Sequence, residues 1–300
     1  MKFAVTGGAG FVGNNIVRLL VSKGYEVTVI DNLHTGKMKN LEGILEKITF
    51  EKIDIRNFKE LESILKNIDG IFHEAALTIV QESFKKEKEY SEVNVRGTEN
   101  IFKIAKKFKI KVVYASSSSI YGNSKQIPIK ENSERKPINP YGQTKLECEF
   151  LAEKYTKEGL NIIGLRYFNI FGKGQTGSYA GVITQFMRKL NEQKYPRIFG
   201  DGLQIRDFIH VTDIAEANLS AMLSNTNSGF FNIGTGLGTK ILDLAKIMIK
   251  IFDEKFEPVF EDSLSGDVKI SQANMTLTKK MINWESKIEL EEGLRKFIHK

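Results

Sequence analysis

The sequence contains few of the residues that build disulfides or metal sites. Its 300 residues include one cysteine, Cys148, and four scattered histidines. A single cysteine excludes an intrachain disulfide and is typical of a protein from a reducing compartment. Neither residue type recurs at the spacing of a metal site. We therefore expect a cytoplasmic protein with no bound metal.

Long apolar runs are also absent. None approaches the roughly 18 residues that a membrane-spanning helix requires, and the opening MKFAVTGG predicts a strand rather than a signal peptide. Only five prolines are present, and they do not cluster in a Pro-rich linker. With 41% hydrophobic and 27% charged residues, the chain has enough apolar material for a buried core and is far from disordered composition.

The net charge of +7 raises the question of a nucleic-acid partner. Acidic residues are interspersed among the lysines in segments such as KKEKE, and no RNA-binding motif with interleaved aromatic residues is present. This pattern favours a solvated, lysine-rich surface. We expect neither nucleic acid nor a membrane as a partner.

The first half of the chain alternates apolar runs with amphipathic stretches. Runs rich in Val, Ile and Phe predict strands at 2–7, 26–32, 48–55, 70–76, 111–117 and 161–172. Helical patterns lie between them, at 12–24, at 89–109 and from about 139. This alternation predicts an α/β fold with a Rossmann-like, doubly wound parallel sheet.

The pattern becomes irregular after about residue 170, with Gly-rich loops followed by short helices. We therefore expect a Rossmann domain at 1–168 and a smaller, mixed α/β substrate domain at 169–300. Part of 205–230 is a candidate to return to the first domain. The second domain should cover the carboxyl ends of the strands, where such sheets bind ligands.

Glycines separate the first predicted strand from the first helix. Gly7, Gly8, Gly10 and Gly13 lie in VTGGAGFVG. Glycine lets the backbone approach a pyrophosphate, and the N–H groups that open a helix attract the anion. Asp31 ends the next strand, where its carboxylate suits a ribose and repels a 2′-phosphate, so NAD is favoured over NADP.

The segment NPYGQTK predicts the start of a helix, with Asn139 as N-cap and Pro140 at its first position. Tyr141 and Lys145 then lie one turn apart on one face. A tyrosine acting as a base near neutral pH needs a pKa lowered by roughly 3 units, or about 4 kcal/mol, and a nearby ammonium contributes to this. Tyr121 and Lys125 share the spacing, but glycine and proline interrupt that segment.

Four consecutive serines, residues 116–119, follow the predicted strand KVVY. They suit either a flexible linker or a strand end that carries hydroxyls into a site. We favour the strand end, because buried strand residues precede the serines and the apolar IYG follows them. A hydroxyl there can share a substrate proton with Tyr141.

Together these segments resemble the extended short-chain dehydrogenase/reductase family and, within it, the UDP-hexose 4-epimerases. The resemblance covers essentially the whole chain and rests on TGGAGFVG, HEAA, VNVRGTENI, SSSSIYG, YGQTK, RYFNIFG, GDGLQIRDFIHVTDIAEA, FNIGTG and GDVKIS. It implies an isomerase that binds NAD and inverts C4 of a UDP-hexose through a transient 4-keto sugar. It also implies a homodimer formed by the helices near 90–109 and 141–158.

The resemblance assigns a role to particular residues of this chain. Ser117, Tyr141 and Lys145 would be catalytic. The cofactor would contact Gly7, Gly10, Phe11, Val12, Gly13, Asp31, Asn32, Asp54, Ile55, Ala75, Ala76, Asn94, Tyr141, Lys145 and Tyr167. The substrate would contact Ser117, Ser118, Ser119, Tyr141, Asn169, Val182, Phe199, Arg206 and Ser271.

Departures from the family patterns narrow the expected reaction. Dehydratases carry Asp and Glu where this chain has Ser118 and Ser119, and decarboxylating relatives carry Glu at the second position. Uronic-acid epimerases often have Thr in place of Asn169 and Arg near Thr176. A neutral hexose is therefore favoured.

Other departures concern the sugar and the nucleotide. Ser271 stands where relatives that exclude N-acetylated sugars have Tyr, so UDP-GlcNAc and UDP-GalNAc should be accepted beside UDP-Glc and UDP-Gal. Leu264 replaces an Arg that usually contacts the diphosphate, and Lys173 with Gly174 replaces a Pro-Arg pair. The alternatives are another NAD-dependent nucleotide-sugar reductase or dehydratase, and a non-catalytic NAD-binding or RNA-associated protein.

Overall fold

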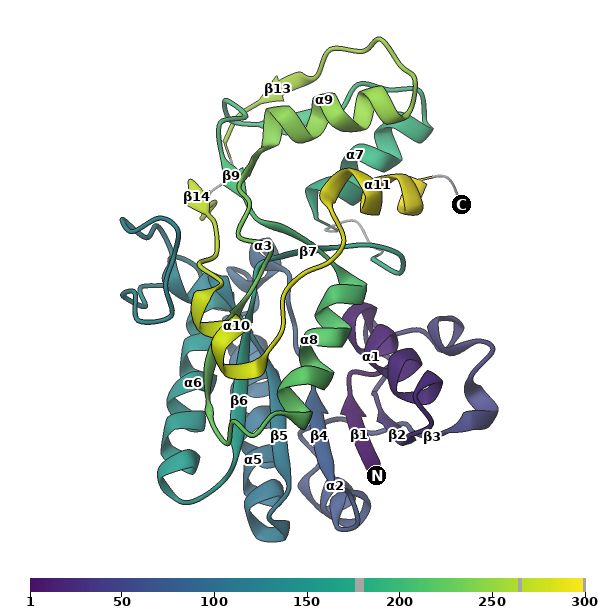
Figure 1. Ribbon diagram of the computed structural model, residues 1–300, viewed down its shortest axis with the longest axis vertical. Coiled ribbons are helices and arrows are strands. Elements are labelled where there is room, and N and C mark those ends of the chain that lie inside the picture. Colours follow the sequence, from purple (N-terminus) through teal and green to yellow (C-terminus); the bar gives the residue numbers. More distant parts are fainter. Residues whose placement is uncertain (176–180, 264–265, 299–300) are drawn as a thin grey trace.

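A seven-stranded parallel sheet forms the centre of the protein (Figure 1). The computed structural model describes residues 1–175, 181–263 and 266–298. The strand order is β11-β6-β5-β4-β1-β2-β3, and every neighbouring pair is parallel. The strands are β1 (Lys2–Thr6), β2 (Glu26–Ile30), β3 (Ile48–Glu51), β4 (Gly70–His73), β5 (Lys111–Ser117), β6 (Ile162–Tyr167) and β11 (Gly229–Ile233). The predicted α/β class and doubly wound parallel sheet are confirmed.

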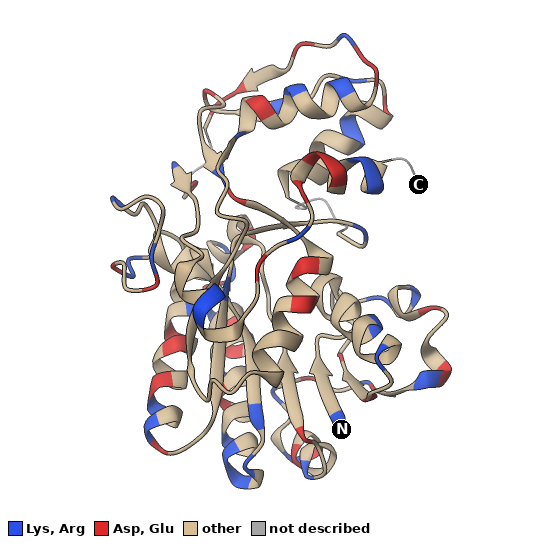
Figure 2. Cartoon of the chain, viewed as in Figure 1, with Lys and Arg blue, Asp and Glu red and all other residues tan. Residues whose placement is uncertain are grey.

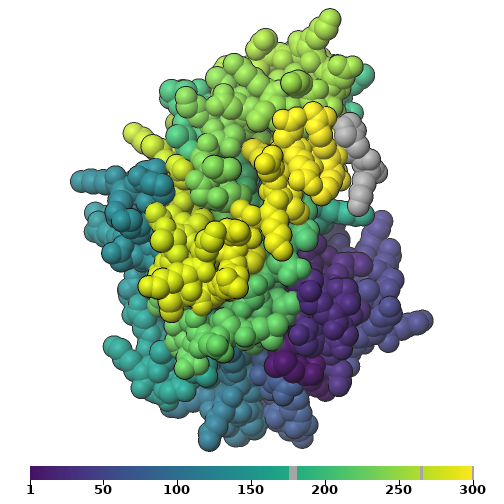
Figure 3. Space-filling view, viewed as in Figure 1, coloured from purple at the N-terminus to yellow at the C-terminus, as the bar shows by residue number. Residues whose placement is uncertain are grey.

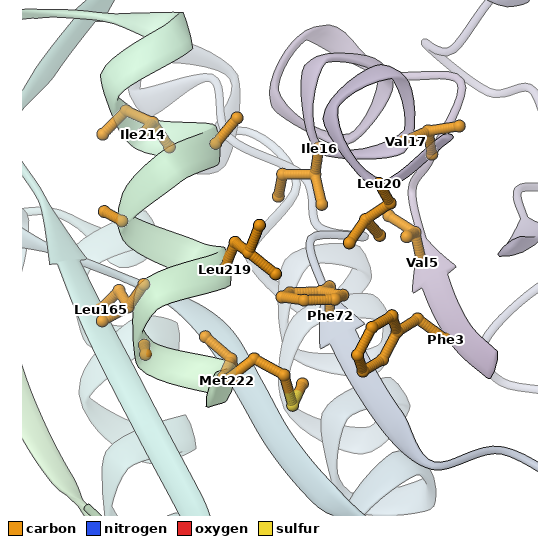
Figure 4. Packing of buried hydrophobic residues seen from close by; sticks show 14 of the residues in the cluster. Phe3, Val5, Ile16, Val17, Leu20, Phe72, Leu165, Ile214, Leu219 and Met222 are labelled. Carbon is orange, nitrogen blue, oxygen red and sulfur yellow. The ribbon is translucent and has the colours of Figure 1, made fainter. Parts of the chain in front are cut away.

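Helices cover both faces of the sheet, which explains why its strands are apolar on both sides. All six residues of β6 are buried. On one face lie α1 (Phe11–Ser22) and α8 (Val211–Leu223), whose residues Ile16, Leu20 and Leu219 pack onto Phe72 of β4 (Figure 4). The other face is covered by α2 (Phe58–Leu65), α5 (Gly97–Phe108) and α6 (Pro140–Lys157).

The long helical pattern predicted at 89–109 is present but not uniform. It comprises α4 (Glu87–Tyr90), a π-helical segment at Ser91–Arg96, and α5. The wider turn precedes Gly97, where an added Cβ would lie 2.5 Å from the Ile55 side chain. Glycine thus lets α5 approach the segment that follows β3.

A smaller lobe lies beyond the carboxyl ends of the strands (Figure 1). Its own core joins Phe186, Ile198, Leu244, Met248 and Leu294. The lobe contains α7 (Val182–Asn191), β8 (Arg197–Phe199), β9 (Ile205–Arg206), β12 (Thr239–Lys240), α9 (Ile241–Ile251), β13 (Val259–Glu261), β14 (Ile270–Ser271) and α11 (Leu290–Ile298). Between lobe and sheet, β7 (Asn169–Phe171) pairs in parallel with β10 (Phe208–His210).

The chain returns from the small lobe to the sheet. Helix α8 packs on α1, β11 extends the sheet beside β6, and α10 (Thr276–Ile282) packs on β11. The final segment then passes over the surface from α10 to α11, as the yellow atoms in Figure 3 show. The division of the chain into domains at residues 168 and 169 stays a prediction.

Basic and acidic residues are interspersed along the outer helices, as the blue and red segments of α6 and α9 show in Figure 2. In the part of the chain that the structure describes, no helix has the length and apolar character needed to cross a membrane. Within the same residues, no group of three or more His, Cys, Asp or Glu side chains is arranged to hold a metal ion.

Candidate active site

The turn after β1 is shaped by glycines that leave no room for side chains. Gly7 has a φ of +67°, and a Cβ there would lie 2.7 Å from the backbone nitrogen of Ala75. A Cβ on Gly13 would lie 2.2 Å from the Gly7 carbonyl oxygen. Helix α1 therefore begins close against β1, with Gly10 as an N-cap that has no side chain. This leaves an open, anion-attracting helix end, which fits the pyrophosphate of a dinucleotide.

Asp31 lies immediately after β2, beside this turn. Its side chain accepts hydrogen bonds from the backbone N–H groups of Ala9, at 3.0 Å, and Leu33, at 2.7 Å. Burial raises the pKa of Asp31, and the two N–H groups oppose that rise. The carboxylate is thus fixed to the glycine turn by the protein's own backbone, in a position suited to a ribose.

Asp54, also predicted to contact the cofactor, is held by a residue that the sequence analysis missed. Arg56 donates from Nε and Nη2 to the two carboxylate oxygens, each at 2.8 Å, and Asn32 donates to one of them at 2.8 Å. The hydrogen bonds from Arg56 hold the pKa of Asp54 far below its usual range. Asn32 and Asp54 therefore lie together at the surface next to Asp31.

The other residues predicted to bind the cofactor differ in burial and in the hydrogen bonds that their side chains form within the protein. Asn94 is buried, and its amide is hydrogen-bonded to both backbone groups of Leu77 and to Thr144. Ile55 is buried against Gly97. Phe11, Val12, Ala75 and Ala76 are half-buried around the glycine turn. The cofactor contacts themselves stay a prediction.

Helix α6 carries Tyr141 in its first turn. The side chain of Asn139 accepts a hydrogen bond from the Gly142 N–H at 2.8 Å, and Pro140 follows, as predicted for this helix start. The backbone N–H of Tyr141 donates to the buried Oγ of Ser83 at 3.2 Å. The position of Tyr141 is therefore fixed from both sides, while its ring stays half-buried.

Lys145 lies one turn further on and connects α6 to β5. Its Nζ donates to the carbonyl oxygen of Ala115 at 2.8 Å and lies 6.0 Å from the centre of the Tyr141 ring. The side chain is buried. A cationic side chain therefore lies beside the phenol ring of Tyr141, as the spacing of the two residues predicted.

The serine run is a strand end and not a linker. Strand β5 continues through Ser117, and residues 118–121 form a 3₁₀ turn in which Ser117 Oγ accepts from the Ser119 N–H at 3.1 Å. A Cβ on Gly142 would lie 2.8 Å from the Ser119 carbonyl oxygen. The serine turn thus packs directly on the turn of α6 that carries Tyr141.

Ser116, the first residue of the serine run, belongs to a buried ionic network that was not predicted from the sequence. Ser116 Oγ donates to Glu149 at 2.7 Å, and Arg166 donates to both oxygens of Glu149 at 2.8 Å. Arg166 also donates to Tyr121 at 2.7 Å, and Tyr121 donates to Asn232 of β11. An arginine within the apolar run IIGLRYF was the signal for this network.

On the small-lobe side, the predicted substrate residues lie on short strands. Arg206 of β9 and Ser271 of β14 are opposite one another in parallel register, and both are buried. The Arg206 guanidinium forms an ion pair with Asp267. Asn169 donates its N–H to the carbonyl oxygen of Asp207 at 2.9 Å, while Val182 and Phe199 are half-buried on α7 and β8. Positions 176 and 264 lie outside the described residues.

Asp207 connects the segments that carry these residues. Its carboxylate accepts from Thr235 N–H and Oγ1, each at 2.7 Å, from Gly236 N–H at 2.9 Å and from Ala273 N–H at 3.1 Å. The side chain is fully buried, and burial raises its pKa against the effect of these bonds. Asp207 therefore fixes β9 and β14 to the loop after β11.

Comparison with protein families gives one match that spans most of the chain. Residues 3–234 match the NAD dependent epimerase/dehydratase family. The chain is 35% identical to a putative UDP-glucose 4-epimerase of Methanocaldococcus jannaschii, over 98% of this chain and 96% of the relative. It is 33% identical to a UDP-N-acetyl-alpha-D-glucosaminuronate decarboxylase of Bacillus cytotoxicus, over 98% and 95%.

Two solved structures are similar over nearly their full length. One is a UDP-glucose 4-epimerase of Thermotoga maritima with UDP-glucose, at a TM-score of 0.95 and 34% identity, covering 100% of this chain and 98% of that one. The other is a UDP-N-acetylglucosamine 4-epimerase of Methanobrevibacter ruminantium in complex with UDP-N-acetylmuramic acid, at 0.95 and 35%, covering 99% and 97%.

Proposed function

The chain belongs to the NAD dependent epimerase/dehydratase family, and from this premise we propose that it is a UDP-hexose 4-epimerase. One observation carries the proposal. The turn of α6 that bears Tyr141 packs on the serine turn after β5, and Lys145 joins the two elements through Ala115. A base, a cation and a hydroxyl-bearing turn are thereby brought to the edge of the sheet that also carries the glycine turn.

Each residue then has a defined task in the reaction. Tyr141, as phenolate, takes the proton from the 4-hydroxyl of the sugar, and Ser117 shares that proton. Lys145 stabilises the phenolate by its charge. NAD, which the glycine turn and Asp31 would hold, would supply the hydride acceptor and donor for C4. Tyr141 gives the proton back to the 4-oxygen after the keto sugar has turned its other face to the site, so C4 is inverted.

The substrate is held by its nucleotide end. Arg206 is suited to the diphosphate, because a guanidinium donates two parallel hydrogen bonds to oxygen anions. Asn169 is proposed to assist it, with Val182 and Phe199 beside the uridine. Anchoring the diphosphate supplies affinity and leaves the sugar free to rotate, which is what allows one base to serve both faces.

The residues after Ser117 favour epimerisation over related reactions. Dehydration requires an acid and a base there, and this chain has the half-buried Ser118 and Ser119. The same serine at position 119 argues against decarboxylation, the reaction named for the Bacillus cytotoxicus relative. A net reductase would consume reduced cofactor, whereas an epimerase regenerates its NAD in each cycle.

Incubation of the purified protein with single UDP-hexoses, without added cofactor, tests the proposal. We expect the C4 epimer to form from UDP-Glc, UDP-Gal, UDP-GlcNAc and UDP-GalNAc, detected by chromatography. Tyr141→Phe should lower the turnover number by about 10²- to 10⁴-fold, the usual contribution of a general base, while NAD binding is retained. Full activity of Tyr141→Phe, or net NADH consumption, would contradict the proposal.

We also propose a cytoplasmic homodimer that pairs α5 and α6 of two subunits. The free, buried Cys148 is compatible with a reducing compartment. Phe150, on the outer side of α6, is 49% exposed and supplies an apolar contact for such pairing. Light scattering of the wild type and of Phe150→Lys tests the dimer, since the charge should shift the mass to that of a monomer.

A further inference from the structure

Glu74 lies among the predicted cofactor residues without having been predicted itself. It is the first residue after β4, next to Ala75, and its carbonyl carbon would lie 3.0 Å from a Cβ added to Gly7. Its carboxyl accepts a hydrogen bond from Tyr167 at 3.0 Å, and it lies within electrostatic range of Lys145. The backbone of Glu74 therefore lies against the glycine turn, while its side chain interacts with Tyr167 and Lys145, two further residues predicted to bind the cofactor.

A hydrogen-bond chain fixes the direction of the Tyr167 hydroxyl. Asn218 of α8 is fully buried and donates from Nδ2 to the Tyr167 oxygen at 2.7 Å and to the Ile214 carbonyl at 2.9 Å. With its oxygen occupied by the Asn218 donor, Tyr167 directs its proton to Glu74. This arrangement supports an ionised Glu74, and a neutral carboxyl can accept the same bond through its carbonyl oxygen.

Burial affects the pKa of Glu74 differently from those of its neighbours Tyr167 and His73. Burial raises the pKa of Glu74 to about 7, against the opposing effects of the Tyr167 bond and the Lys145 charge. Burial raises the pKa of Tyr167 well above its usual value. His73 precedes Glu74 on β4, and burial lowers its pKa to about 3, so the imidazole between Thr6 and Thr98 is neutral.

We propose that Glu74 is a positioning residue of the cofactor site that exchanges a proton with solvent according to the charge of the bound nicotinamide ring. The inference rests on the proposed function. The oxidised ring carries a positive charge that the reduced ring lacks, and the pyrophosphate is common to both. The oxidised cofactor therefore favours the carboxylate, with the proton released to solvent, and the reduced cofactor favours the neutral acid.

This coupling has a consequence for the reaction. Above neutral pH the ionised Glu74 stabilises the oxidised cofactor, which favours return of the hydride to the sugar. Below neutral pH the neutral carboxyl removes that preference, so the reduced cofactor persists longer and the keto sugar has more time to escape. Glu74 thus favours the oxidised cofactor, the form that must be regenerated in each cycle.

Titration calorimetry of NAD and NADH into cofactor-free protein tests the inference without measuring activity. In buffers of different ionisation enthalpy near pH 7, we expect proton release with NAD and little with NADH. The ratio of the dissociation constants, NADH over NAD, should rise about tenfold between about pH 6 and pH 8, the change that corresponds to a pKa shift of about one unit between the two complexes.

Three variants separate this role from a structural one. Glu74→Gln should bind both dinucleotides with a ratio that no longer depends on pH. Tyr167→Phe removes a hydrogen bond that stabilises the carboxylate, so the pH midpoint of the ratio should move upward. Glu216→Gln changes a half-buried carboxyl of α8 away from this cluster and should behave as the wild type.

The outcomes are distinguishable from failure of the proposed function. A wild type that binds neither dinucleotide would overturn both that function and this inference. Binding with the same pH dependence in wild type and Glu74→Gln would overturn the inference alone. If Glu74→Gln does not fold, an unchanged midpoint in Tyr167→Phe would overturn it.

Discussion

At the scale of single residues, four identical side chains in the serine run have different environments. Ser116 and Ser117 are buried, while Ser118 and Ser119 are half-buried. Successive residues of a strand point to opposite faces, so Ser116 reaches Glu149 while Ser117 can turn toward the site. The run therefore combines a structural hydroxyl with the one proposed to share the substrate proton.

Ser271 gives a prediction about substrate choice. It is 6% exposed and lies directly across from Arg206, and we propose that it adjoins the C2 substituent of the sugar, where a larger side chain would crowd an N-acetyl group. We expect Ser271→Tyr to lower kcat/KM for UDP-GlcNAc by about tenfold or more, because overpacking typically costs 1–3 kcal/mol, and to leave UDP-Glc nearly unchanged. Steady-state kinetics with both sugars measures the ratio.

The matched control is Ser271→Ala, which keeps the space and removes only the hydroxyl. It should preserve the wild-type ratio of kcat/KM values. Equal losses for both sugars in Ser271→Tyr would mean that the residue does not adjoin the C2 substituent.

At the scale of elements, helix α6 carries both the proposed catalytic residues and a residue of the buried ionic network. Tyr141, Lys145 and Glu149 are spaced by four residues and therefore share one face of the helix, and Lys145 and Glu149 bond to residues of β5. The helix start is specified by Asn139 and Pro140. The contacts of Glu149 with Ser116 and Arg166 then fix the rotation of α6 against β5 and β6.

Removing the charge of Glu149 should destabilise the fold strongly. Its side chain is 0% exposed and that of Arg166 only 3%, so the variant would leave a buried guanidinium without its counter-charge. We expect Glu149→Gln to lose about 3–5 kcal/mol of unfolding free energy, measured by denaturant titration.

Glu153→Gln is the control for this prediction. Glu153 also pairs with Arg135, at 2.8 Å, but its side chain is 38% exposed. An exposed ion pair contributes about 1 kcal/mol or less, so this variant should remain close to the wild type. Equal losses in the two variants would show that burial of the pair does not determine its contribution.

Most elements of the sheet follow from local sequence, since Val, Ile and Phe runs bounded by glycine or polar residues specify strands. Two features did not follow. Strand β11 was not predicted, because GFFNI is as short as many apolar loop segments and its place beside β6 depends on contacts distant in the chain. The other is the π-helical turn at Ser91–Arg96, which immediately precedes Gly97, the glycine that lies close to Ile55.

At the scale of the whole molecule, pH should affect stability through Glu74. Its pKa is about 7 in the folded protein, above the ordinary value of 4.5, because of burial. The folded state binds this proton more tightly than the unfolded state. Stability from this group is therefore complete below about pH 4.5 and is lost as the pH rises through about 7.

Glu74→Gln isolates this contribution from those of other groups. The difference in melting temperature, variant minus wild type, should increase between about pH 5 and pH 8, since only the wild type must keep a desolvated carboxylate at high pH. Scanning calorimetry across this range measures it. A difference independent of pH would mean that Glu74 titrates alike in both states.

The sequence by itself determined the α/β class, the approximate positions of the first six strands along the chain, the glycine turn and the helix start at Asn139, because each depends on neighbours within a few residues. It also placed Tyr141 and Lys145 one turn apart. Only the tertiary structure decided that β11 joins the sheet, that Arg56 holds Asp54, and that Glu149 pairs with Arg166. Glu74 belongs to the same group, because its environment comes from Gly7, Lys145 and Tyr167, which lie far apart in the chain. Burial and charge at such positions are set by packing between distant segments, and no local pattern contains that information.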